Sequence, residues 1–180
     1  DPDINVTLSG LKIMNGKSSS GGGILNYGTI TLVDSILSEN SACGNGGGIL
    51  NNCNLTVIGS SISCNTALGD GGGISNRGTA VAKGSTISEN TATDNGGGIF
   101  SNKMVTVIDC TVSNNKATSD GGGILNDERG IATVVGSSII ENEVYGGLST
   151  GGIVNGRFGK LNLSDSSISR NMGSGMTNRG

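Results

Sequence analysis

The side chains that could carry out chemistry include 14 acids, 11 bases and four cysteines, and this 180-residue chain contains no histidine. Without histidine it can form neither a Ser-His-Asp or Cys-His nucleophile nor a histidine-ligated metal site. Enzymes that hydrolyse polysaccharides need clustered carboxylates, whereas Glu39 and Glu89 are separated by Cys64 at their midpoint. We therefore expect no catalytic residue, no bound cofactor and no metal site, and we predict that the protein is not an enzyme.

Basic and aromatic residues recur at equivalent points along the sequence, each shortly after an asparagine. Two segments there, 127–130 and 156–159, are each two residues longer than their counterparts. This edge is a candidate binding site for a partner, a glycan or an acidic group; the alternative is two solvated loops without a function. The candidate edge residues are Tyr27, Arg77, Arg129, Arg157 and Phe158.

The four cysteines are Cys43, Cys53, Cys64 and Cys110, and no two of them form a C-x-x-C pair, which argues against zinc. Cys110 falls in a column of serines, which predicts a free, buried thiol. A Cys43–Cys64 disulfide is the first pairing to test, although the spacing alone does not determine connectivity.

These residues sit on a strict internal repeat. Glycine makes up 34 of the 180 residues, well above its usual share of roughly 7%, and it is periodic. A Gly-Gly-Gly-Ile motif recurs every 25 residues, at 21–24, 46–49, 71–74, 96–99 and 121–124, with degenerate copies at 151–153 and 175–176. Periods of 20 to 50 residues are typical of solenoids and propellers.

Two asparagine columns run in phase with the glycines. The first follows an aliphatic residue and two intervening positions, as in Ile87-Ser-Glu-Asn90, and comprises Asn40, Asn65, Asn90, Asn115, Asn142 and Asn171. The second lies two residues after the isoleucine, with Ser101 as the exception, and includes Asn26, Asn51, Asn76, Asn126 and Asn155. We expect both columns to point inward and to form hydrogen-bonded ladders.

Short alternating segments such as Thr29-Ile-Thr-Leu-Val33 indicate strands, and no window shows a sustained helical period. A 25-residue unit is too short for a propeller blade and fits three short strands joined by three corners. The sequence therefore predicts an all-β fold, a single-stranded right-handed parallel β-helix of about seven coils that occupies residues 1–180 as one domain.

Corner and face residues follow from this register. A column of Asp and Gly, beginning with Asp34 and Gly59, predicts left-handed corners. The residues after each isoleucine face outward if their neighbours face inward. They form either an apolar association stripe or a surface covered by the preceding loops: Leu25, Leu50, Phe100, Leu125 and Val154. A longer corner, 143–150, is expected to pack over its own coil, with a contact to a partner as the alternative.

Together, the GGGI and [ILV]-x-x-N motifs resemble the paired GGA[ILV] and F-x-x-N repeats of the polymorphic outer membrane protein family, and more broadly the β-helix repeats of bacterial and archaeal surface proteins. Glycine replaces alanine in the first motif, and an aliphatic residue replaces phenylalanine in the second. The resemblance implies a surface-exposed passenger that acts in adhesion, and it implies no catalytic residues.

The expected function is therefore that of a structural or adhesive module, extracellular or on the cell surface. The partners to consider are a host or matrix protein, a glycan, or further copies stacked head to tail into a filament, since the chain is expected to be either a segment of a longer protein or a stacking subunit. A carbohydrate-binding or carbohydrate-active protein is the alternative, and an ice-binding solenoid with a threonine face is a lesser one. The net charge of −3, the four aromatic residues and the short apolar runs predict neither nucleic-acid binding nor membrane insertion.

Overall fold

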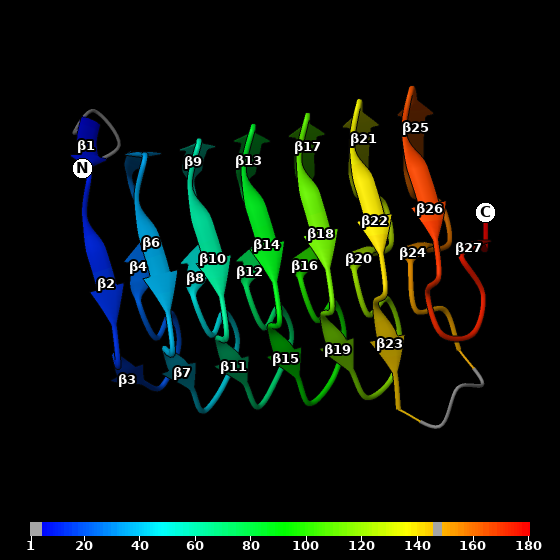
Figure 1. Cartoon of the computed structure of the whole chain (residues 1–180), viewed down its shortest axis with the longest axis horizontal. Helices are drawn as coiled ribbons and strands as arrows, with labels where there is room; N and C mark the ends of the chain where they lie inside the picture. Colours follow the sequence, from blue (N-terminus) through cyan, green and yellow to red (C-terminus); the bar gives the residue numbers. More distant parts are fainter. Residues whose placement is uncertain (1–4, 146–148) are drawn as a thin grey trace.

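The computed structural model describes residues 5–145 and 149–180, which form a parallel solenoid of about seven stacked turns (Figure 1). Each turn of about 25 residues contributes strands to four sheets that run the length of the molecule, and the described residues contain no helix. The all-β parallel β-helix predicted from the period is confirmed. The prediction of three strands per turn is wrong, because a fourth strand of only two residues follows the second corner.

Sheets A and B each contain seven parallel strands. Sheet A consists of β1 (Asn5–Ser9), β5 (Thr29–Val33), β9 (Asn54–Ile58), β13 (Thr79–Lys83), β17 (Met104–Ile108), β21 (Ile131–Val135) and β25 (Lys160–Ser164). Sheet B consists of β2 (Lys12–Met14), β6 (Ile36–Ser38), β10 (Ser61–Ser63), β14 (Thr86–Ser88), β18 (Thr111–Ser113), β22 (Ser138–Ile140) and β26 (Ser167–Ser169).

Sheets C and D complete each turn. Sheet C has the two-residue strands β3 (Lys17–Ser18), β7 (Ser41–Ala42), β11 (Thr66–Ala67), β15 (Thr91–Ala92), β19 (Lys116–Ala117) and β23 (Glu143–Val144). Sheet D has β4 (Ile24–Asn26), β8 (Ile49–Asn51), β12 (Ile74–Asn76), β16 (Ile99–Ser101), β20 (Ile124–Asn126), β24 (Ile153–Asn155) and β27 (Met176–Asn178).

The bends between sheets A and B are left-handed, as the Asp and Gly column predicts. The residues at this corner have φ between 46° and 63°: Gly10, Asp34, Gly59, Gly84, Asp109, Gly136 and Asp165. A second left-handed corner follows sheet B, and the sequence analysis missed it because its residues share no turn signature. Its members have φ between 54° and 59°: Asn15, Glu39, Cys64, Glu89, Asn114, Glu141 and Arg170.

The interior is narrow and built from stacked aliphatic side chains. Leu37, Ile62, Ile87, Val112 and Ile139 lie above one another from sheet B with no exposed surface. Sheets A and D add further isoleucine, leucine, valine and alanine columns to the same core. Because these side chains stack in register, the core needs no aromatic residue to fill it.

Both predicted asparagine ladders are present. In the ladder from Asn40 to Asn171, each amide nitrogen donates to the amide oxygen of the next turn at 2.9–3.0 Å. The same nitrogen of Asn65 also donates to the carbonyl oxygen of Leu37 at 3.0 Å. Each buried amide thus bridges neighbouring turns, which satisfies polar groups that would otherwise be costly to bury.

The second ladder, which starts at Asn26, is interrupted at one turn. Asn76 donates to Ser101 Oγ at 3.0 Å, and the ladder resumes where Asn126 donates to Asn155 at 2.7 Å. Between these turns, Asn126 Oδ1 is buried and has no hydrogen-bond partner. The shorter serine side chain therefore leaves a gap in an otherwise regular structure.

The triple glycines allow the backbones of neighbouring turns to approach each other. A Cβ atom at Gly47 would lie 2.5 Å from the carbonyl oxygen of Gly72 and 2.6 Å from that of Thr66. Gly46, the first glycine of the same triplet, has a φ of 71°, in the left-handed region that glycine adopts readily. The motif is thus a packing requirement.

The prediction of an exposed apolar stripe is wrong for four of its five positions. Leu50, Phe100, Leu125 and Val154 are each at most 7% exposed, and the last three form a second, smaller apolar cluster. Only Leu25, at 44%, is exposed. The four buried side chains are absent from the main core cluster, and three of them pack against one another instead, so these positions are covered.

The longer corner 143–150 falls partly outside the described residues, since 146–148, including Leu148, are not described. Of its other apolar residues, Val144 is buried in sheet C, and Tyr145 is 57% exposed.

Candidate functional site

The candidate edge is the corner at which the chain passes from sheet D to sheet A. Arg77, Arg129, Arg157 and Phe158 are all exposed there, on three turns of the solenoid. Tyr27 is 69% exposed at the same corner, but on an earlier turn. The edge predicted from the sequence is therefore a real surface feature, extended along the axis of the molecule.

Part of this corner is hollowed into a groove of about 360 Å³. Its lining residues come from three successive turns: Arg77, Gly78, Thr79, Lys103, Met104, Arg129 and Ile131. The structure thus brings Arg77 and Arg129 into one site and adds Lys103, which was not among the predicted site residues. We name this feature the basic groove. It does not include Tyr27, Arg157 or Phe158.

The strand register positions the groove residues. Thr79, Met104 and Ile131 begin strands β13, β17 and β21 and pair directly in sheet A. The basic residues precede them by one or two positions. The corner behind them is held by the second asparagine ladder, since Asn76 accepts a hydrogen bond from the backbone nitrogen of Gly78 at 3.2 Å and donates to its carbonyl oxygen at 3.0 Å.

The two longer loops at this edge have matching conformations. Gly130 donates to Asp127 and Gly159 donates to Gly156, both across 3.0 Å. The residue before each final glycine is left-handed, with φ of 65° at Arg129 and 68° at Phe158. Gly156 also donates to Asn126 at 2.7 Å, so one loop stacks on the other.

One aromatic contact lies in the second loop. The Arg157 guanidinium lies 5.3 Å from the ring centroid of Phe158, a cation–π contact. Because the ring is 63% exposed, it remains accessible from solvent. The sequence signal for this loop was its extra length.

The charges of the basic groove are not neutralised by ion pairs. The described residues form three ion pairs: Lys116–Glu143, Arg170–Glu141 and Arg179–Asp120. None of these involves Arg77, Lys103 or Arg129. In a chain whose net charge is −3, the groove is thus a local region of opposite sign.

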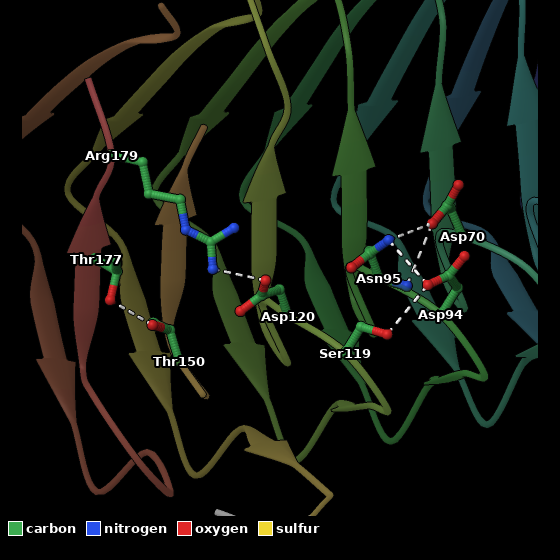
Figure 2. A network of polar contacts seen from close by, with 8 residues as sticks. All are labelled: Asp70, Asp94, Asn95, Ser119, Asp120, Thr150, Thr177 and Arg179. Carbon is green, nitrogen blue, oxygen red and sulfur yellow. Dashed lines mark hydrogen bonds and ion pairs between the residues drawn. The ribbon is translucent and has the colours of Figure 1, made fainter. Parts of the chain in front are cut away.

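A network of polar side chains occupies the loops that lead from sheet C to sheet D (Figure 2). Asn95 donates from its backbone and its amide to Asp70 Oδ1, at 3.2 and 3.0 Å. Ser119 and Asn95 both donate to Asp94 Oδ1 at 3.1 Å. Within the described residues, no group of three or more acidic or cysteine side chains is arranged to hold a metal ion.

Burial raises the pKa of Asp70 above its ordinary value, and the negative charges of Asp94 and Asp127 add to this, while the hydrogen bonds from Asn95 oppose it. Farther along the same surface, Arg179 reaches back from beyond β27 to pair with Asp120 at 2.7 Å (Figure 2). Several of these contacts connect different turns, and Arg179–Asp120 spans two of them, so the network has a structural role.

The predicted Cys43–Cys64 disulfide is not formed, since all four cysteines are free. Cys64 lies in the second left-handed corner, where its sulfur is 3.6 Å from Glu89 Oε2, whereas Cys43 follows strand β7 beyond that corner. Desolvation raises the pKa of the Cys64 thiol, and Glu89 raises it further. Cys110 is buried as predicted, and its thiol donates to the carbonyl oxygen of Ile108 at 3.1 Å.

Two stretches of the chain, 84–102 and 109–127, match the family model of the Chlamydia polymorphic membrane protein (Chlamydia_PMP) repeat. Each contains one [ILV]-x-x-N motif and one complete GGGI motif, at successive turns of the parallel β-helix. These two stretches, together with the parallel β-solenoid, match a polymorphic membrane protein-type β-helix repeat region. Repeats of this type indicate a surface-exposed bacterial protein.

No curated protein and no solved structure gives a significant match to this repeat region. Across residues 5–145 and 149–180, there is no helix with the length and apolar character required to cross a membrane.

Proposed function

We propose that this polymorphic membrane protein-type repeat region is a non-enzymatic structural and adhesive module of an extracellular or cell-surface protein. The observation that carries the proposal is that buried residues and corner residues have different roles within each turn. Buried ladders of asparagine and aliphatic residues hold neighbouring turns together, and the corner residues between sheets D and A differ from turn to turn. A rigid support with variable corners suits a protein that presents contact sites at a distance from the cell.

The mechanism is mechanical and does not require a reaction. Seven turns at a spacing of about 4.8 Å give a rod about 34 Å long. Every internal strand is paired on both sides, so the rod resists bending and keeps its lateral groups in a fixed order along the axis. Adhesion would then arise from contacts between these lateral groups and a host or matrix protein or glycan.

Adhesion of coated beads to cells tests this proposal. Beads carrying the purified chain should adhere to cultured epithelial cells and to deposited matrix, and beads carrying heat-denatured chain or albumin should not. Adhesion equal to that of the albumin beads on both surfaces would contradict the adhesive role.

Head-to-tail self-association is a second arrangement that we propose, because, among the described residues, the first and last strands of each sheet pair on one side. Apolar side chains are exposed near these edges, including Val6 at 39% and Met176 at 45%. Sedimentation of the 180-residue chain over a dilution series, with electron microscopy, measures the association. Filaments with a repeat of one chain length would support it, and a monomer at all concentrations would contradict it.

A further inference from the structure

We infer that the basic groove binds a linear acidic polysaccharide that lies along the solenoid axis, across successive turns. This inference rests on the proposed adhesive function and assigns it a ligand class and a site. The residues that carry it are Arg77, Lys103 and Arg129 for the anionic groups, with Met104 and Ile131 beneath the sugar rings.

The first argument is the distribution of charge. Six of the 11 basic residues lie at or next to the corner between sheets D and A: Arg77, Lys103, Arg129, Arg157, Lys160 and Arg179. Arg179 is paired with Asp120 outside sheet D, which leaves five at this edge. Two acidic residues in the first long loop, Asp127 and Glu128, partly offset the positive charge of this edge.

The second argument is the periodicity of the charges. Arg77, Lys103 and Arg129 occur on three consecutive turns whose strands pair in register. Adjacent turns are separated by about 4.8 Å, which is shorter than the Debye length of about 8 Å at physiological ionic strength. The three cations therefore act together on one ligand, and a chain with repeated anionic groups matches cations that occur on successive turns.

The third argument is the mixed character of the groove surface. Met104 is 46% exposed and Ile131 is 36% exposed, and both line the groove beside Thr79. A pyranose ring offers C–H groups on its faces and hydroxyl groups at its rim, so it can contact the apolar side chains and the threonine hydroxyl together. The neighbouring exposed ring of Phe158 offers a further apolar surface along the same line.

Binding of labelled oligosaccharides in solution tests the inference. The probes are a heparin fragment, a polygalacturonate oligomer of similar length and neutral dextran. We expect at least one acidic glycan to bind and dextran to show no binding, with an affinity that falls as salt rises because ionic contacts are screened. The two acidic probes distinguish sulfated from carboxylated sources of the same chemistry.

Matched variants locate the site. Arg77→Gln combined with Arg129→Gln should weaken binding about tenfold, since each partly exposed ionic contact is worth up to about 1 kcal/mol and tenfold corresponds to about 1.4 kcal/mol. Lys12→Gln combined with Lys17→Gln removes the same charge from exposed positions in sheets B and C and should leave affinity unchanged. Ile131→Thr should weaken binding without changing its salt dependence.

Several outcomes would overturn the inference. These are absence of binding to both acidic glycans and equal loss of affinity in the two double variants. Adhesion of the coated beads that persists in the Arg77→Gln/Arg129→Gln variant would also overturn it while leaving the adhesive function standing. Adhesion lost from this variant, with far-ultraviolet circular dichroism unchanged, would support both.

Discussion

At the residue scale, the buried asparagine amide is the group that connects one turn to the next. Asn90 illustrates this, because its amide oxygen accepts from the backbone and side chain of Asn65 while its nitrogen donates to Ile62 and Asn115. A side chain that is fully buried and fully hydrogen-bonded specifies the register between turns, because a shifted register would leave several polar groups without partners.

The interruption of the second asparagine ladder at Ser101 leads to a prediction about stability. Ser101→Asn should supply a donor to the unpaired oxygen of Asn126 and raise the free energy of unfolding by about 1–2 kcal/mol. Urea denaturation of the variant and the parent chain measures the change. Asn76→Ser, which shortens the preceding member of the ladder, should lower stability instead. A loss of stability in Ser101→Asn would show that the turn is packed around the shorter side chain.

Asp70 makes a prediction about pH. Because burial raises the pKa of Asp70, the folded chain binds this proton more tightly than the unfolded chain, so the carboxylate destabilises the fold at pH values above its folded pKa. This penalty disappears as the pH falls below the ordinary pKa of an aspartate, where both states are protonated. Asp70→Asn should therefore stabilise the protein at pH 7 and have little effect at low pH.

Denaturation midpoints at several pH values measure this effect. Asp165→Asn, at an exposed corner, is the control and should change stability little at any of them. A stabilisation of Asp70→Asn that is the same at all pH values would contradict the assignment to the buried charge.

At the element scale, the left-handed corners decide where each strand ends. Gly84 has a φ of 56°, and a Cβ atom there would meet nothing within 4 Å. A substitution at this corner therefore tests backbone conformation without steric contact. Gly84→Val should lower the free energy of unfolding by about 1–2 kcal/mol, because a β-branched residue tolerates a left-handed backbone poorly.

Gly84→Asn is the matched variant, since asparagine adopts this conformation more readily, and it should remain close to the parent in stability. Thermal unfolding followed by circular dichroism compares the three chains. Equal destabilisation by valine and asparagine would indicate that the loss comes from contacts of the added side chain.

At the scale of the whole molecule, each turn contacts only its two neighbours, so stability should vary along the axis. Ile62, Ile87 and Val112 are fully buried in the central turns, whereas Ile13 and Ile168, in β2 and β26, are only partly buried. Hydrogen exchange of the 180-residue chain should therefore be slowest in β10, β14 and β18 and fastest in β2 and β26. Uniform exchange across all turns would instead indicate that the solenoid opens as a single unit.

Much of the fold could be predicted because its determinants are local and repeated. The GGGI motif, the two asparagine columns and the Asp or Gly corner all recur at one spacing, and only a stacked parallel coil satisfies all of them. The second left-handed corner could not be predicted, because Glu39, Cys64 and Arg170 carry no conformational signature of their own. There the backbone is held by the turns on either side.

The candidate site divides in the same way. The architecture, the inward ladders and the edge that carries Arg77 and Arg129 could be predicted, because periodicity assigns each position to a face. Three features emerge only in the folded chain: Lys103 joins these residues in one groove, Leu50, Phe100, Leu125 and Val154 are covered, and Cys43 and Cys64 are free. These features depend on contacts between side chains of different turns, and a repeat pattern does not encode such contacts.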